Sequence, residues 1–216
     1  MIIRRDVICV MATAIVSALP VRRTWGDTDP TWAAQFVRQI GNEMVALVAA
    51  NDPPAARAQR LQSFIDRVVD VEGTARFCLG RFWRQATAAQ QRDYVALFHT
   101  VLVRAVLSRI NSVPQGGNDV HVTVDRAEAH ADSIHVPTTV QRSGSPPFRV
   151  TWVVSDDPNN PRIIDVLAEG TSLRITVRSD YYSFLGRHGD DINALLEALR
   201  RQACESCPPP TGSVGQ

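Results

Sequence analysis

The chain has 216 residues, of which 44% are hydrophobic, and this length favours one domain with appendages over several domains. Its 23 basic and 22 acidic residues give a formal net charge of +1. This balance lacks the clustered basic excess of a nucleic-acid-binding protein.

The first residues have the pattern of an export signal. Arg4 and Arg5 precede an uncharged run from Val7 to Leu19. This run is shorter than the roughly 20 residues of a membrane-spanning helix, so a permanent anchor is the weaker alternative. We therefore expect residues 1–26 to be a signal peptide and the mature protein to be exported to the periplasm.

Three helices are predicted before residue 80. Asp29 and Pro30 form a helix start, with Asp as the cap and Pro at the first helical position, and residues 51–54 end this helix. A second helix follows, with its apolar stripe at Leu61, Phe64, Ile65 and Val68. Asp70 then caps a short helix, which Gly80 ends.

The longest predicted helix opens at Thr87 and Gln90, which have the spacing of a capping box, and runs to about Ile110. Apolar residues surround it on nearly all sides, so we expect other elements to cover it. It is either a central core helix or a helix with one face on a cavity, and periodicity does not separate the two.

After a break at residues 114–117 the apolar pattern changes to period two, which predicts strands. We expect strands at residues 120–124, 133–141, 148–154 and 162–167, joined by turns rich in Pro, Gly, Asn and Asp. One face of the third strand would carry Phe148, Val150, Trp152 and Val154. The pattern predicts an antiparallel meander.

Two helices, at about residues 176–185 and 190–202, close the domain, and Asp190 is the expected cap of the second. The order of elements predicts an α+β fold, with helices packed on one face of a curved, mainly antiparallel sheet. We assign residues 27–203 to this domain. Residues 204–216 are rich in Pro and Gly and are predicted to be a disordered tail.

Cys204 and Cys207 have the spacing of a redox pair or of half a zinc site. A second pair of ligands at matching spacing is missing, so we favour a small structural disulfide in an oxidising compartment. Cys78 is then expected to be a buried apolar residue.

The sequence carries no motif of an enzyme. A nucleophile turn of the form Gly-x-Ser-x-Gly and glycine loops for phosphate are missing. His121, His130 and His135 lie near aspartates, but their spacing matches no metal-ligand motif. We therefore predict no catalytic residues, no metal and no cofactor.

Two groups of residues carry a resemblance to a known family. They are Asp165-Val-Leu-Ala-Glu-Gly-Thr-Ser-Leu-Arg174 with Arg178-Ser-Asp-Tyr181, and Leu79-Gly80-Arg-Phe-Trp83 with Gln90-Gln91-Arg92. Through them, residues 29–202 resemble the MlaC, or toluene-tolerance, family of periplasmic proteins. Members of this family carry phospholipid between the two membranes of Gram-negative bacteria.

The resemblance implies an apolar cavity between sheet and helices that accepts acyl chains and leaves the headgroup near the rim. It also implies two partners, an inner-membrane ABC lipid transporter complex and an outer-membrane lipoprotein complex. The residues expected to contact lipid are Phe77, Leu79, Trp83, Tyr94, Phe98, Leu102, Val150, Trp152, Val166, Leu173 and Tyr181.

Three alternatives stay open. The segment through Arg178 also resembles a hopanoid-associated branch of the same superfamily, which would carry a polycyclic lipid. A protein-interaction module of this fold would fill its cavity with its own side chains. An enzyme that uses His and Asp residues of the sheet would need an open polar pocket.

Overall fold

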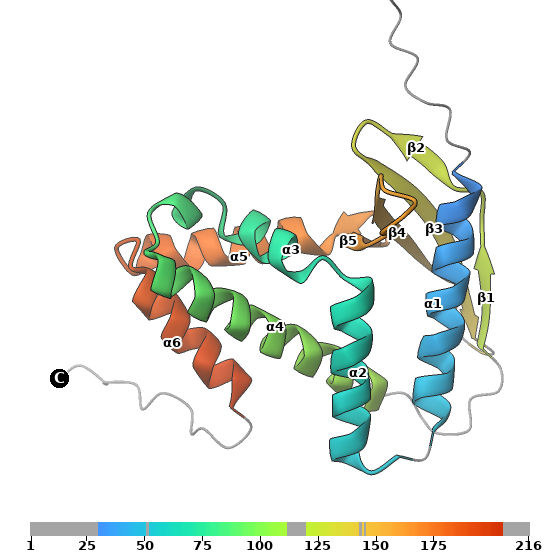
Figure 1. The fold of residues 1–216 in the computed structure, drawn as a ribbon, viewed down its shortest axis with the longest axis horizontal. Coiled ribbons are helices and arrows are strands. Elements are labelled where there is room, and N and C mark those ends of the chain that lie inside the picture. The colour runs from blue at the N-terminus through green and yellow to red at the C-terminus, as the bar shows by residue number, and fades with distance from the viewer. Residues whose placement is uncertain (1–29, 51, 112–119, 143, 145, 205–216) are drawn as a thin grey trace, which may run out of the picture.

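The computed structural model describes residues 30–204 except 51, 112–119, 143 and 145. Figure 1 shows the described elements. In chain order they are α1 (Thr31–Ala49), α2 (Pro54–Val68), α3 (Val71–Leu79), the 3-10 helix η1 (Gly80–Arg84), α4 (Ala88–Asn111), β1 (Val120–Val124), β2 (Glu128–His130), β3 (Ser133–Arg142), β4 (Phe148–Ser155), β5 (Ile163–Ala168), β6 (Thr171–Ser172), α5 (Leu173–Arg187) and α6 (Ile192–Ala203).

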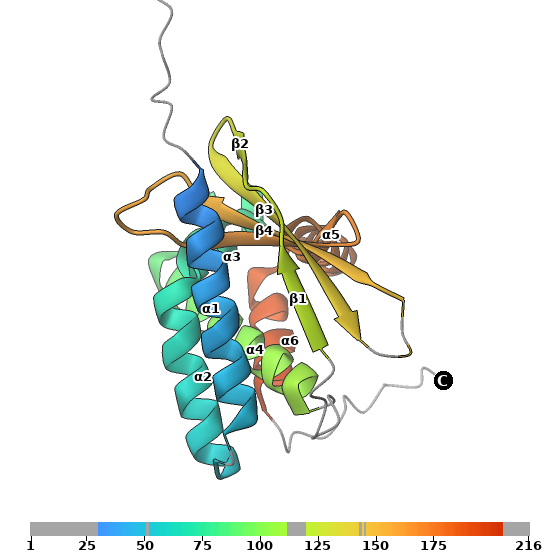
Figure 2. The same cartoon turned by 90° about the vertical axis from the view of Figure 1, so that its right-hand side faces the viewer.

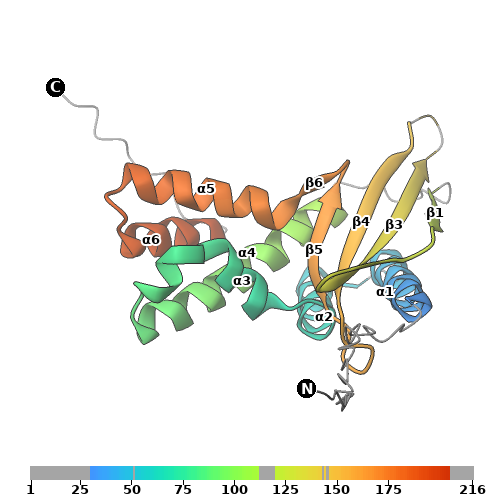
Figure 3. The ribbon, with the colours of Figure 1, turned by 90° about the horizontal axis from the view of Figure 1, so that it is seen from above.

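The strands form one antiparallel sheet in the order β1-β3-β4-β5-β6, and β2 pairs with β3. The predicted α+β class and the antiparallel meander are confirmed. The prediction missed β2, whose three residues are all exposed and so lack an apolar alternation, and the two-residue β6. Helices α1 and α2 lie on one face of the sheet, whereas α3, α5 and α6 extend beyond its β5 edge (Figures 2 and 3).

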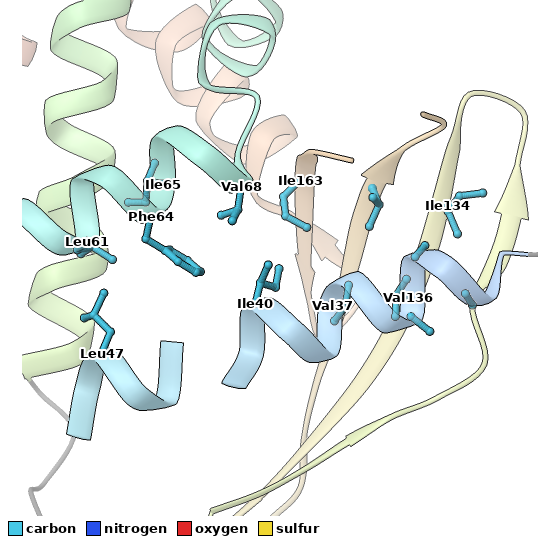
Figure 4. Close-up of a cluster of buried hydrophobic side chains, with 14 of the residues drawn as sticks. Val37, Ile40, Leu47, Leu61, Phe64, Ile65, Val68, Ile134, Val136 and Ile163 are labelled. Atoms are coloured by element: carbon cyan, nitrogen blue, oxygen red, sulfur yellow. The ribbon is translucent and has the colours of Figure 1, made fainter. Parts of the chain in front are cut away.

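The buried residues form two clusters. The first, which we call the sheet cluster, joins α1, α2 and the sheet through residues such as Val37, Phe64 and Val136. Figure 4 shows these side chains pointing toward one another. The second, the helical cluster, joins α3, η1, α4, α5 and α6 through residues such as Phe82 and Leu195.

Helix α4 contributes to both clusters. Tyr94 and Phe98 in its N-terminal half belong to the helical cluster, and Val103 in its C-terminal half belongs to the sheet cluster. The two halves therefore bury different sides of the helix. This change of partners explains why apolar residues surround α4 on nearly all sides.

Two of the predicted helix starts, at Thr87 and at Asp70, are confirmed by their hydrogen bonds. Thr87 and Gln90 form the reciprocal capping box, in which the Gln90 amide donates to Thr87 Oγ1 and the Thr87 amide donates to Gln90 Oε1 (3.2 and 2.9 Å). The Asp70 carboxylate accepts from the Gly73 amide (2.9 Å). At α1, Pro30 occupies the cap position rather than the first helical position, and Asp29 lies outside the described residues.

Two predicted helix starts are wrong. Helix α5 begins at Leu173 rather than near residue 176, because Ser172 Oγ accepts from the Ile175 amide (3.1 Å). The cap of α6 is Asp191 and not Asp190. Asp190 has a positive φ of 60° and its amide donates to the Leu185 carbonyl (2.9 Å), so it belongs to the end of α5.

The structure describes only part of the sequence at the two chain ends. The signal peptide predicted at residues 1–26 lies outside the described residues, as do Cys207 and the rest of the predicted tail beyond Cys204. Cys204 itself is disulfide-bonded. Within the described ranges, no helix has both the length and the apolar character to cross a membrane.

The buried carboxylate of Asp165 holds the turn between the sheet and α5. Its side chain is 4% exposed and accepts from the amides of Val166 and Arg174 (2.7 and 3.1 Å) and from the Ser172 hydroxyl. The Arg174 guanidinium lies 3.4 Å from the same carboxylate. Asp165 therefore closes the path from β5 through β6 into α5.

Arginines then connect this turn to the helical cluster. The guanidinium groups of Arg174 and Arg178 lie over the Phe77 ring, at 4.4 and 5.0 Å from its centroid. Arg178 also donates to the Phe77 carbonyl and to Tyr182 Oη (both 3.2 Å). These contacts dock α5 on α3, and Arg174 and Arg178 both belong to the C-terminal segment that carried the family resemblance.

Gly80 allows this close packing. Its φ is +57°, and a Cβ at this position would lie 2.3 Å from Tyr182 Oη.

Gly80→Ala is expected to lower the free energy of unfolding by about 2–4 kcal/mol through backbone strain and overpacking. Gly186→Ala is the control, because its Cβ would meet no atom within 4 Å and it lies in α5. In urea titrations the control should be as stable as the wild type or slightly more so; equal stability of the two variants would contradict this role of Gly80.

Asp165→Ala is expected to lower the free energy of unfolding by about 3 kcal/mol, because it leaves buried donors and a guanidinium without their acceptor. Asp180→Ala removes an exposed carboxylate from α5 and should change the stability little. Thermal unfolding of the two variants by circular dichroism compares them. A wild-type midpoint for Asp165→Ala would show that the turn does not depend on this carboxylate.

Candidate functional site

One face of the sheet is a continuous apolar surface. The strand register aligns three rows of residues on this face, because side chains that are paired directly across strands share a face. The rows are Val122–Val140–Phe148, Val124–Thr138–Val150–Ala168 and Val136–Trp152–Val166. We call this surface the apolar face. It confirms that Phe148, Val150, Trp152 and Val154 lie on one side of β4.

Burial changes along the apolar face from one end to the other. Ile134 and Val154 are 3% and 0% exposed where α1 covers the sheet. At the opposite end Phe148 is 45% and Val122 is 52% exposed. Val140 lies between them in the same row, and apolar side chains that are left exposed in this way indicate a surface that binds another apolar group. We call Val122, Val140, Phe148 and Val150 the open end of this face.

The helices beside the apolar face add further apolar side chains that are only partly buried. These side chains pack against the sheet cluster and keep some accessible surface. They are Phe36 and Met44 on α1, and Leu102, Val106 and Ile110 on α4. Apolar surface therefore lies on the sheet and on the helices next to it, and this surface favours contact with other apolar groups.

The polar atoms on this face are paired within the protein. The Trp152 indole Nε1 donates to Thr138 Oγ1 (3.2 Å), and the Thr138 hydroxyl donates to the Val150 carbonyl (2.9 Å). Both side chains thus avoid the cost of an unpaired polar group. The indole ring of Trp152 is free to contact an apolar ligand without desolvating its N–H.

The predicted lipid-contact residues do not all lie on one surface. Val150, Trp152 and Val166 belong to the apolar face, and Leu102 on α4 packs against both clusters. The others belong to the helical part of the protein: Phe77, Leu79, Trp83, Tyr94, Phe98, Leu173 and Tyr181. As lipid contacts, all of these residues stay a prediction.

The residues of the helical part have packing roles of their own. Leu79 and Tyr94 are completely buried, and the Tyr94 hydroxyl donates to the Ala75 carbonyl (3.0 Å). Burial raises the pKa of Tyr94 and of Tyr181 above the usual range of tyrosine. Leu173, by contrast, is 48% exposed at the first position of α5.

Within the open end, sequence reasoning assigned only Val150 to lipid contact. Phe148 was predicted on the β4 face and Val122 lies in the predicted strand at residues 120–124, but neither was assigned to lipid contact. The sequence signal was the alternation of apolar and polar residues in β1. This strand pairs with β3 in a register that places Val122 opposite Val140.

The described titratable groups provide little for catalysis. The rings of His130 and His135 stack at 3.8 Å, and burial, with a smaller effect from His130, lowers the pKa of His135. Burial raises the pKa of Cys78 to about 12, so this thiol is unreactive at neutral pH. The described part of the chain contains no group of three or more His, Cys, Asp or Glu residues that could hold a metal ion.

Four surface hollows lie elsewhere on the protein. Two of them, of about 560 and 1210 Å³, border α2, and one of about 220 Å³ lies beside the start of α1. The fourth, of about 530 Å³, lies at the turn from α3 into η1 and includes Phe77 and Trp83. Val122, Phe148 and Trp152 line none of these four, and Val124 is the one residue of the apolar rows that borders any of them, at the small hollow beside α1.

Comparisons with known proteins agree with this architecture. A phospholipid-binding protein from Ralstonia solanacearum, solved in complex with a phospholipid, matches with a TM-score of 0.66 and 22% sequence identity. The match covers 79% of this chain and 96% of that protein, and at this identity it shows a shared fold. The sequence family described as MlaC protein matches residues 27–201. The chain therefore belongs to the MlaC family.

Proposed function

We propose that this protein is a lipid carrier that binds the acyl chains of a phospholipid on the apolar face. The observation that carries the proposal is the open end of this face, where Phe148 and Val122 stay about half exposed although Ile134 and Val154 at the other end of the same face are buried. Family membership and the phospholipid in the R. solanacearum structure support the same class of ligand.

Hydrophobic transfer is sufficient to drive such binding. Moving about 30 methylenes of two acyl chains out of water gives on the order of 24 kcal/mol, at ~0.8 kcal/mol for each methylene. A bilayer offers nearly the same free energy. A carrier with an apolar face can therefore exchange lipid with a membrane complex at a small net cost, without a cofactor or nucleotide of its own.

The proposed setting is the periplasm. The export-signal pattern before residue 27 and the family membership support it. There the carrier would move phospholipid between an outer-membrane lipoprotein complex and an inner-membrane ABC transporter. The same evidence favours a binding protein over an enzyme.

A pair of neighbouring substitutions tests the role of the apolar face. Val150→Glu puts a carboxylate on this face, whereas Thr151→Glu puts the same charge on the opposite face of β4. Val150→Glu is expected to reduce co-purifying phospholipid by about tenfold or more, because an acyl chain cannot solvate the carboxylate. Thr151→Glu should retain wild-type lipid content.

The measurement is native mass spectrometry of the protein purified without detergent, with identification of the bound lipid. Circular dichroism first establishes that both variants fold. Equal lipid content in the two variants would contradict a binding site on the apolar face. A bound polycyclic lipid would replace phospholipid as the cargo, and a wild-type protein that stays empty after incubation with vesicles would favour a protein-interaction module.

A further inference from the structure

A hollow lined by arginines lies at the turn from α3 into η1, in the helical part of the protein. Its volume is about 530 Å³, and half of its eight lining residues are arginines. The lining residues are Gly73, Arg76, Phe77, Gly80, Arg81, Trp83, Arg84 and Arg178. We call it the arginine hollow. The strands that carry the apolar face lie on the other side of the molecule from the turn that follows α3 (Figure 1).

The positive charge of the arginine hollow is only partly neutralised. Arg81 lies 3.7 Å from the Asp190 carboxylate. Arg178 donates to the neutral oxygens of Phe77 and Tyr182 and keeps its charge uncompensated. Among the described residues, no carboxylate forms an ion pair with Arg76 or Arg84. In the part of the chain that the structure describes, the lining of the hollow thus holds three arginines without an ion pair, in a chain whose net charge is close to zero.

Aromatic rings lie against the guanidinium groups of Arg76, Arg81 and Arg178. Arg76 lies over the Trp83 ring at 5.7 Å, Arg81 over the Phe82 ring at 4.7 Å, and Arg178 over the Phe77 ring at 5.0 Å from the centroid. A guanidinium that stacks on a ring keeps its N–H edge available for a planar oxyanion. Less side-chain entropy is then lost when the anion binds.

Acidic residues around the hollow determine which anion fits. Glu72, Asp180 and Asp190 are exposed on the helices and the turn that surround it. A continuous anionic membrane surface would bring its charges against these carboxylates as well as against the arginines. One or two carboxylates on a narrow segment can enter the hollow without that repulsion, and their planar shape matches the guanidinium fork.

The geometry points to the arginine hollow as a docking site for a carboxylate-bearing segment of a partner protein. This inference goes beyond lipid binding, because the hollow shares no residue with the apolar face. It assigns the two tasks of a carrier to different ends of the molecule. Cargo contacts the sheet, and a partner recognises the helical end.

The test uses two capped peptides that differ only in charge, one with two adjacent Glu residues between glycines and one with two Gln residues. The Arg Nε–H and Trp83 indole signals of the isotope-labelled full-length protein report binding by NMR. We expect the Glu peptide, and not the Gln peptide, to shift the signals of Arg76, Arg84 and Trp83. The double variant Arg76→Gln with Arg84→Gln should weaken this binding by about fivefold or more.

Arg187→Gln is the matched control, because Arg187 is an exposed arginine on α5 outside the hollow and its removal should not change peptide binding. Absence of these shifts, or equal binding by the double variant and the wild type, would overturn the proposal. So would binding to anionic phosphatidylglycerol vesicles that the double variant loses while its peptide affinity is unchanged. Lipid content, measured on the same samples, is expected to be equal in all variants and reports on the carrier function separately.

Discussion

The arrangement of this protein depends on the buried carboxylate of Asp165. It accepts hydrogen bonds from the turn that leads into α5 and pairs with Arg174, which in turn stacks on Phe77 of α3. The next residue along β5, Val166, points to the opposite side and joins the apolar face. Because side chains alternate along a strand, one face of β5 holds the helical part through Asp165, and the other face contributes Val166 to the proposed lipid-binding surface.

This division explains how the chain keeps an apolar surface partly open and still folds. The helical cluster is closed, with completely buried side chains such as Phe82 and Leu185, and it supplies stability without contributing to the open end. The apolar face of the sheet is closed at Ile134 and Val154, where α1 covers it, and stays exposed at Val122 and Phe148. Exposing Phe148 and Val122 costs hydrophobic free energy, and a lipid that covers them would recover it.

Local signals predicted most of the fold. The capping box at Thr87 predicted a hydrogen bond, and the alternation in β4 predicted which residues share a face. Both features depend only on residues that are close in the sequence. The cap of α6 was misplaced by one residue because the end of α5 takes Asp190 into a left-handed turn. That conformation depends on how α5 ends, which residue types near the cap do not reveal.

The site was harder to predict than the fold. Periodicity shows that a residue such as Tyr94 or Val150 is apolar and faces inward, but it does not show whether protein or ligand fills the space. Tyr94 is completely buried by the helical cluster, whereas Val150 belongs to the open end. The resemblance to the family drew attention to segments around Asp165 and Gly80, and their contacts here hold α5 against α3.

Photo-crosslinking with a phospholipid that carries a diazirine near the end of an acyl chain tests the central claim most directly. After illumination of the loaded protein, peptide mass spectrometry locates the labelled residues. The apolar face predicts labels on β1, β3 and β4 and on the C-terminal half of α4. Labels confined to α3, α5 and α6 would place the acyl chains in the helical part and contradict the account.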